Sequence, residues 1–376
     1  MNILLLTRYL SADVGGGYYL FTILAELLAK SGHKVWVITN KVEGIKNLQH
    51  DNIKIIFVTS QSINEIQHWN QVDKMRYIFS AIKIGVGIVK KEKIDIIHSN
   101  PIYPVFAGSL ISLLTSTPHI KTIHDLHSLK KANSKSRLGY VLEKILIKSK
   151  CSAVHTVSES SKDDLIRFGT KKPIYVIPNG IPIRKSEEIK QEPYQLVTIG
   201  RLAFHKNIQV AIKAIKIVKK SFPKVSLVII GDGEYRKNLE KLVNELDLHD
   251  NIVFKGQTLE EDKIKLLASS HALIFPSFIE GFGIVILEAF TQKKPVLVSN
   301  VRPMTDIVEH QKTGLVLPAN DEKAWAQAIE HILGNLQETQ KMGENGRKVL
   351  EERYGHEKMN RKILEMYDEV IKGSKA

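Results

Sequence analysis

The chain of 376 residues has a single cysteine, Cys151, which excludes a disulfide framework and a cysteine-based zinc site. It also lacks a long hydrophobic run: the longest uncharged stretch, between His98 and Lys121, is interrupted by three prolines and is unsuited to spanning a membrane. Within that stretch we interpret 105–114 as a helix buried between two strands. The first ten residues lack the basic and apolar regions of a signal peptide and predict a strand. With the low cysteine usage, these features favour a cytoplasmic protein.

Acidic residues are in deficit, and the deficit is unevenly distributed. Lys and Arg outnumber Asp and Glu by 54 to 40, a formal net charge of +14. Residues 1–188 carry 26 basic and 15 acidic residues, whereas residues 189–376 carry 28 and 25. The first half therefore suits an anionic partner such as nucleic acid, an anionic membrane surface or a phosphate-bearing substrate. A lysine-rich genome would produce the same composition without any such partner.

Short apolar runs alternate with amphipathic stretches in both halves, the pattern of parallel sheets covered by helices on both faces. Strands are expected at 3–6, 35–38, 53–58, 94–98, 120–124 and 153–157, and then at 196–199, 226–230, 252–255, 272–275, 295–298 and 314–317. Helices are expected at 19–30, 77–91, 105–114 and 138–148, and then at 209–220, 235–246, 260–269, 283–290 and 322–333.

A proline-rich linker, 178–193, separates the two halves. We predict an α/β protein with an N-terminal domain over 1–185, a second domain over 186–354 and a C-terminal amphipathic helix within 355–376 that could cap either domain. Open parallel sheets bind ligands beyond the carboxyl ends of their strands, so chemistry is expected in the loops that follow strands.

Two cations follow the expected strand at 196–199. Arg201 and Lys206 lie between this strand and the next helix, a position that suits a phosphate group. Considered alone, the pair is more simply explained as two solvated charges in a turn.

A second motif, PSFIEGFG, follows the expected strand at 272–275. Gly281 and Gly283 allow a ligand to approach the backbone, and amides at the helix start can receive an anion. Glu280 and Glu288 would place two carboxylates along one ligand, and a carboxylate can accept two hydrogen bonds from the vicinal hydroxyls of a ribose or hexose. A helix-capping Glu280 and a surface Glu288 are the alternative.

Two further loops carry weaker signals. Glycines 15–17 occupy a phosphate-loop position but match neither the GxGxxG nor the Walker pattern. His124 ends an expected strand and could act as a base or hydrogen-bond donor, although a structural role is simpler. His124, Asp125 and His127 do not complete a metal-ligand set, so we expect no metal site.

Together these segments resemble the retaining nucleotide-sugar glycosyltransferases of the GT-B fold, the family 4 or "group 1" class. The resemblance runs from Gly15 to about Leu333 and is carried by IGRLAFHKN, VIIGDGEYRKNLEKL, FKGQT and FPSFIEGFGIVILEAF, in that order. It implies two Rossmann-like domains facing across a cleft, with the C-terminal helix crossing back to the first. The sequence departs from the family at 291–294 and 301–306, which weakens any inference about the sugar recognised.

The resemblance also implies a role for each matching residue. Arg201 and Lys206 would bind the donor diphosphate and stabilise it as the leaving group, without a metal. Glu288 would hold the ribose hydroxyls, while Glu280 and His124 would face the transferred sugar. Further donor contacts are implied for Gly16, Thr258, Gly281, Phe282 and Gly283.

The resemblance implies a role for the basic first half, because the family binds its acceptor there. Residues 121–150 hold eight basic and two acidic residues, with apolar residues at helical spacing among them. We expect an acceptor or membrane surface formed by Lys130, Lys131, Lys135, Arg137, Lys144 and Lys148. A core-facing helix with a solvated basic edge is the alternative.

The sequence therefore predicts a cytoplasmic enzyme, peripheral on the inner face of the cell membrane. We expect it to transfer a hexose or N-acetylhexosamine from a nucleotide diphosphate sugar, a UDP-sugar before a GDP-sugar, with retention and without a metal cofactor. A lipid-linked glycan acceptor in bacterial surface polysaccharide or oligosaccharide synthesis is expected first. The alternatives are a soluble acceptor (a storage glucan, a disaccharide or a small-molecule glycoside) and a basic nucleic-acid-binding protein, which the scarcity of interleaved aromatics disfavours.

Overall fold

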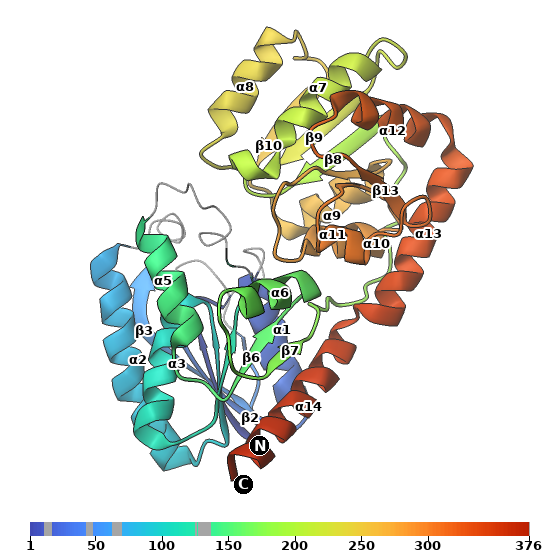
Figure 1. Ribbon diagram of the computed structural model, residues 1–376. Helices are drawn as coiled ribbons and strands as arrows, with labels where there is room; N and C mark the ends of the chain where they lie inside the picture. Colours follow the sequence, from blue (N-terminus) through green and yellow to red (C-terminus); the bar gives the residue numbers. More distant parts are fainter. Residues whose placement is uncertain (11–16, 43–47, 62–69, 125, 127–136, 376) are drawn as a thin grey trace. The chain divides into compact units, whose positions relative to one another are not determined.

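A computed structural model of the chain describes residues 1–10, 17–42, 48–61, 70–124, 126 and 137–375 (Figure 1). The chain forms two compact units: unit 1 comprises Met1–Gly180 and His356–Ala376, and unit 2 comprises Ile181–Gly355. Each unit holds one parallel sheet with helices packed on it. This arrangement confirms the predicted α/β class with two Rossmann-like domains.

Unit 1 is built on a seven-stranded sheet in the order β3-β2-β1-β4-β5-β6-β7. Its strands are β1 Asn2–Thr7, β2 Lys34–Val42, β3 Ile53–Gln61, β4 Ile96–Asn100, β5 His119–Thr122, β6 Ala153–Thr156 and β7 Ile174–Val176. Its helices are α1 Gly17–Lys30, α2 Gln71–Glu92, α3 Ile102–Thr115, α5 Arg137–Lys148, α6 Glu159–Arg167 and α14 His356–Lys375.

The central strand β1 shows why the strands of this sheet are continuous apolar runs. Successive side chains of a strand point to opposite faces. Ile3 and Leu5 pack on the side of α1 and α14, whereas Leu4 and Leu6 pack on the side of α2 and α3. Both faces are buried, so both sets of side chains are apolar.

The C-terminal helix α14 belongs to unit 1, as the resemblance implied. Met359, Ile363, Met366 and Tyr367 lie at the spacing of one helix face and are buried in the same cluster as residues of α1 and β1. The last helix of the chain therefore completes the core of the first unit.

A directed chain of hydrogen bonds joins α14 to the sheet. The carbonyl of Ile177 can only accept, so Nε2–H of His155 donates to it (3.1 Å), and the hydroxyl of Thr122 donates to Nδ1 of His155 (2.9 Å). Nε2–H of His98 then donates to Thr122, and the hydroxyl of Tyr367 donates to Nδ1 of His98, each at 2.6 Å. Burial lowers the pKa of His98 well below its usual value and that of His155 to about 4, so both rings are neutral.

Unit 2 is built on a six-stranded sheet in the order β10-β9-β8-β11-β12-β13. Its strands are β8 Gln195–Ile199, β9 Ser226–Ile230, β10 Ile252–Gly256, β11 Leu273–Phe275, β12 Val296–Ser299 and β13 Gly314–Leu317. Its helices are the 3₁₀ helix η2 Phe204–Lys206, α7 Ile208–Val218, α8 Arg236–Glu245, α9 Glu260–Ser269, α10 Ile284–Thr291, α11 Met304–Ile307, α12 Glu322–Gly334 and α13 Leu336–Arg353.

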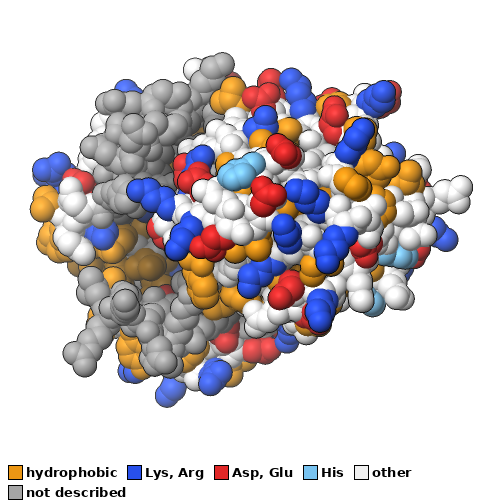
Figure 2. All heavy atoms as spheres, turned by 90° about the horizontal axis from the view of Figure 1, so that it is seen from above, with side chains coloured by type: hydrophobic (Ala, Val, Ile, Leu, Met, Phe, Trp, Pro, Cys, Tyr) orange, Lys and Arg blue, Asp and Glu red, His pale blue; other side chains and the backbone are white. Residues whose placement is uncertain are grey.

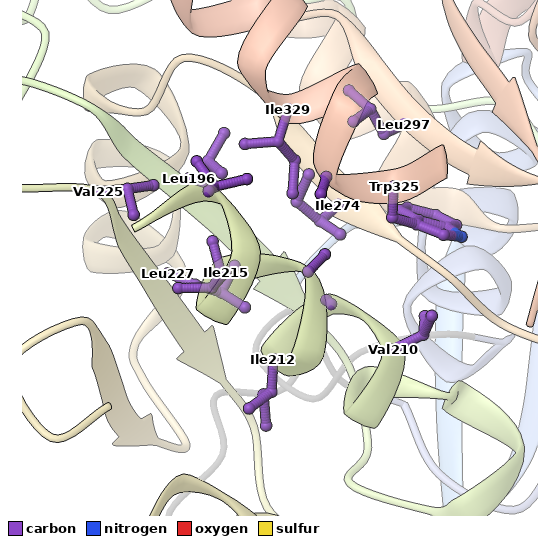
Figure 3. Packing of buried hydrophobic residues seen from close by; sticks show 14 of the residues in the cluster. Leu196, Val210, Ile212, Ile215, Val225, Leu227, Ile274, Leu297, Trp325 and Ile329 are labelled. Atoms are coloured by element: carbon purple, nitrogen blue, oxygen red, sulfur yellow. The ribbon is translucent and has the colours of Figure 1, made fainter. Parts of the chain in front are cut away.

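The core of unit 2 lies between this sheet and helices α7 and α12. Ile212 and Ile215 of α7 pack with Trp325 and Ile329 of α12 over the strands, and Trp325 is fully buried (Figure 3). The indole N–H of Trp325 donates to the carbonyl of Pro318 at 2.9 Å, which satisfies its polar group. This rigid layer supports the loops at the carboxyl ends of the strands.

Two expectations about unit 1 are wrong. The interpretation of 105–114 as a buried helix fails on one side of α3, where Leu110, Leu113 and Leu114 are 42%, 54% and 61% exposed. Lys121, one of the eight basic residues from which a basic surface over 121–150 was inferred, is fully buried in β5. Its ammonium group donates to three carbonyls at the end of α5, those of Leu146, Ile147 and Ser149, and so caps that helix.

Candidate functional site

The loop after β8 carries the two cations expected to bind phosphate. The guanidinium of Arg201 is 61% exposed and pairs with the carboxylate of Glu234 at 3.1 Å. Lys206 ends the short helix η2 and is only 19% exposed. Arg201 therefore extends from a solvent-exposed turn, whereas Lys206 is held within the unit.

Lys206 and Glu280 contact one another directly. The ammonium group lies 2.5 Å from Oε1 of Glu280, whose side chain is 11% exposed, and 5.4 Å from the centre of the Phe275 ring. A backbone hydrogen bond from Phe278 to the carbonyl of His205, at 2.8 Å, ties the two loops together. The fold thus brings together a cation and a carboxylate that are 74 residues apart in the sequence.

Helix α10 begins at Gly283, whose φ of 96° is disfavoured for residues with a side chain. No side chain among the described residues caps this helix start. The Ile286 amide donates to the carbonyl of Gly283 at 3.0 Å, and the amides before it in the first turn can receive an anion, as the sequence suggested. Phe282 is buried and makes an edge-to-face contact with Tyr354, with 5.9 Å between ring centres, so only its backbone can contribute to binding.

Glu288 lies one turn inside α10 and is held by a lysine that the sequence analysis missed. Nζ of Lys263, on α9, lies 3.0 Å from Oε1 of Glu288 and 2.7 Å from Glu260. Burial raises the pKa of Glu288, and the ammonium group of Lys263 opposes that rise. Spacing along the chain gave no signal for Lys263, because the pair joins two different helices.

Seven buried polar atoms of unit 2 have no hydrogen-bond partner among the described residues, and three of them belong to the candidate site or the loops beside it: Oε2 of Glu288, Oγ1 of Thr258 and Oγ of Ser277. They lie on α10 and in the loops after β10 and β11. Buried polar atoms are almost always satisfied, so unpaired ones near a sheet edge favour a polar ligand. Ser277 was absent from our predictions, although it stands within the PSFIEGFG motif.

The motif after β9, GDGE, positions the Arg201 loop by close backbone packing. A side chain at Gly231 would collide with the carbonyl of Gly200. Glycine therefore lets the two turns touch, and Glu234 reaches Arg201 from the second turn.

Basic and acidic side chains are interspersed on the surface seen in Figure 2, in keeping with the near-balance of charge over 189–376.

The residues predicted in the first half of the sequence are only partly described. His124 follows β5 in unit 1, where its carbonyl accepts a hydrogen bond from Ser161 at 2.9 Å. Lys144 and Lys148 are exposed on α5, and Lys144 lies over the Tyr140 ring at 4.5 Å. Gly16, Lys130, Lys131 and Lys135 lie outside the described residues, as does the side chain of Arg137.

Among the described residues, no group of three or more His, Cys, Asp or Glu side chains is arranged to hold a metal ion. None of the helices in the described ranges is long and apolar enough to cross a membrane.

Comparisons with known proteins cover both units. The family model described as "Glycosyl transferases group 1" matches residues 181–349, and that described as "Glycosyltransferase Family 4" matches residues 14–185. A capsular polysaccharide biosynthesis glycosyltransferase of Staphylococcus aureus is 26% identical over 88% of this chain and 93% of its own.

Two solved structures share the fold. Sucrose-phosphate synthase from Thermosynechococcus elongatus has a TM-score of 0.84 at 21% identity and covers 99% of this chain and 100% of its own. Anabaena HepE in complex with UDP-glucose has a TM-score of 0.78 at 19% identity and covers 97% and 99%.

Proposed function

Because the chain belongs to the group 1 and family 4 glycosyltransferases, we propose that it transfers a hexose or N-acetylhexosamine from a nucleotide diphosphate sugar to a glycan acceptor. One observation carries the choice of donor. Unit 2 combines phosphate-binding groups (Arg201, Lys206 and the uncapped start of α10) with a carboxylate, Glu288, that keeps one buried oxygen unpaired. A nucleoside diphosphate has the two matching groups, a diphosphate and a vicinal diol.

The proposed reaction breaks the bond between the anomeric carbon and the diphosphate oxygen, which keeps the electron pair. Lys206 and Arg201 neutralise the charge that grows on the diphosphate, and the amides of Gly281, Phe282 and Gly283 donate to it. The acceptor hydroxyl forms the new glycosidic bond on the same face and passes its proton to the departing phosphate. Removing one preorganised donor of this kind typically lowers the rate about 10²–10³-fold.

The remaining assignments complete the donor pocket. Glu288 accepts from the two ribose hydroxyls, and such charge-assisted bonds contribute roughly 1.5–3 kcal/mol each. Glu280, released from Lys206 when the diphosphate binds, and His124 of unit 1 contact the transferred sugar. Thr258 lies beside the nucleobase, and Gly16 completes the contacts. A UDP-sugar is the first choice, a GDP-sugar the second, and no metal is needed.

The similarity to a capsule glycosyltransferase supports a lipid-linked acceptor in surface polysaccharide or oligosaccharide synthesis. We assign the acceptor to the domain over 1–185 and the donor to the domain over 186–354. The enzyme works in the cytoplasm at the inner face of the cell membrane, where the exposed Lys144 and Lys148 of α5 face an anionic surface.

The test is nucleotide release from UDP-, GDP- and ADP-sugars in the presence of EDTA. We expect release from one donor, stimulated by membrane extract and reduced about 10²-fold or more in Arg201→Ala and Lys206→Met. Glu261→Gln, an exposed carboxylate on α9, is the matched control. Release without stimulation by extract would favour a soluble acceptor. A lack of donor binding by calorimetry across the panel would refute the proposal.

A further inference from the structure

Most of the exposed large apolar residues described in unit 1 lie on three neighbouring helices. Val72, Met75 and Phe79 of α2 are 65%, 50% and 65% exposed, at helical spacing. Val141 and Ile145 of α5 are 49% and 50% exposed. With Leu110, Leu113 and Leu114 of α3, they form a layer of side chains that the sheet leaves uncovered. A concentration of exposed apolar side chains on neighbouring helices is typical of an interaction site on a folded domain.

Packing within the unit places these side chains on one face. Helix α3 packs against both α2 and α5, and the three are drawn side by side in Figure 1. Gly85 of α2 lies directly against Ile111 of α3, and Val105 of α3 shares a buried cluster with Leu146 of α5. We call this surface the α2–α3–α5 face.

The exposed charges on this face are mostly basic. The three helices contain eight basic and three acidic residues, and α3 itself has no charged residue. Lys83, Lys90, Lys144 and Lys148 are exposed. By contrast, Glu143 is 6% exposed, and the side chain of Asp73 is 25% exposed beside Arg76. The third acid, Glu92, is also only half-exposed.

We propose that the α2–α3–α5 face docks on an anionic lipid surface, with its aliphatic side chains in the interface and its lysines at the headgroups. A helix layer that combines aliphatic residues with flanking lysines matches the chemistry of such an interface. Each lysine near it contributes about 1 kcal/mol. Lysine stems also extend along apolar surface while the ammonium groups reach the phosphates.

The charge pattern favours lipid over a second copy of the chain. A two-fold contact would place this basic face against an identical basic face, and like charges brought together disfavour association. Nucleic acid would accept the lysines but not the exposed leucines of α3. The proposal deepens the proposed function, because it states how a lipid-linked acceptor is reached, but it uses other residues than the donor site.

The experiment is co-sedimentation of the full chain with vesicles, which requires no turnover. We expect binding to equal parts of phosphatidylglycerol and phosphatidylcholine at low salt, and weaker binding to phosphatidylcholine alone or at high salt. Leu113→Asp with Leu114→Asp, and separately Phe79→Asp, should each lower the partition coefficient about ten-fold or more, because burying one such side chain contributes roughly 1.5–3 kcal/mol.

The matched control is Ile166→Asp on α6, a side chain of the same unit that is 55% exposed and lies outside the face. Nucleotide binding by calorimetry checks that each variant is folded. Wild-type chain that stays in solution with anionic vesicles, or leucine variants that bind like the wild type, would overturn the proposal. A wild-type dimer dissociated by the leucine substitutions would assign the face to a second copy instead. Either result leaves the transferase proposal standing, because that proposal depends on nucleotide release.

Discussion

Lys263 and Glu288 show how one residue sets the charge of another. Burial raises the pKa of Glu288 above its usual value, and the Lys263 ammonium acts against that rise. Glu260 pushes the pKa of Glu288 up and Arg184 pulls it down. Because an ionised carboxylate is needed to accept from both ribose hydroxyls, Lys263 is a positioning residue for the proposed donor site.

Replacing that lysine should make nucleotide binding sensitive to pH. In Lys263→Met the pKa of Glu288 rises further, so the carboxylate takes up a proton as the pH falls. We expect affinity for the nucleotide to fall from pH 8 to pH 6 in this variant, about ten-fold if one charge-assisted hydrogen bond is lost, and to change less in the wild type. Titration calorimetry across that range measures the effect.

Lys263→Arg should restore the wild-type profile, and Lys265→Met, which replaces an exposed lysine of the same helix, should leave it unchanged. Equal pH profiles for Lys263→Met and the wild type would reduce Lys263 to a packing role.

At the scale of the elements, the attachment of α14 to the sheet depends on the hydrogen bond from one buried hydroxyl, that of Tyr367. Tyr367→Phe removes the donor to Nδ1 of His98 and leaves that buried nitrogen unpaired, a loss of roughly 1–3 kcal/mol. We expect hydrogen exchange of the α14 amides to speed up about ten-fold or more. Tyr175→Phe also removes a hydrogen bond to α14, an exposed one to Glu369 at 2.9 Å. It should have little effect, and equal effects of the two variants would contradict a special role for the buried chain.

Periodicity in the sequence predicts most helices and strands of both sheets, because strands buried on two faces and amphipathic helices have distinct patterns. It misses β7, α6, α11, α13 and the 3₁₀ helix η2: β7, α11 and η2 have only three or four residues, and α13 is mostly polar. It also misjudges the burial of α3, because the composition of a mostly apolar helix does not show which of its sides packs against the protein. The motifs indicate which loops carry the candidate site, but the partners Lys263 and Glu234 come from other elements and are found only in the fold.

For the molecule as a whole, the distribution of buried histidines predicts that acid destabilises unit 1 before unit 2. Burial lowers the pKa of His119 to about 3 and that of His155 to about 4. The unfolded chain binds these protons near pH 6.5, so between pH 6.5 and 4 it holds more protons than the folded chain. The contribution of these neutral histidines to the free energy of unfolding is therefore complete above about pH 6.5 and is lost as the pH falls toward 4. Hydrogen exchange at pH 7.5 and 5, corrected for intrinsic rates, should show unit 1 loosening before unit 2. Protection lost first in unit 2 would contradict this assignment.

The placement of α14 also affects the order in which the chain can be assembled during synthesis. Unit 2 is continuous in sequence and is complete once residue 355 has left the ribosome. Unit 1 is translated first, but its core is incomplete until Met359, Ile363 and Tyr367 have been synthesised. Domains generally fold as units, the N-terminal one first, whereas here the domain that is started first is finished last. Its unfinished apolar surface beside α1 must stay soluble while about half of the polypeptide is still being made.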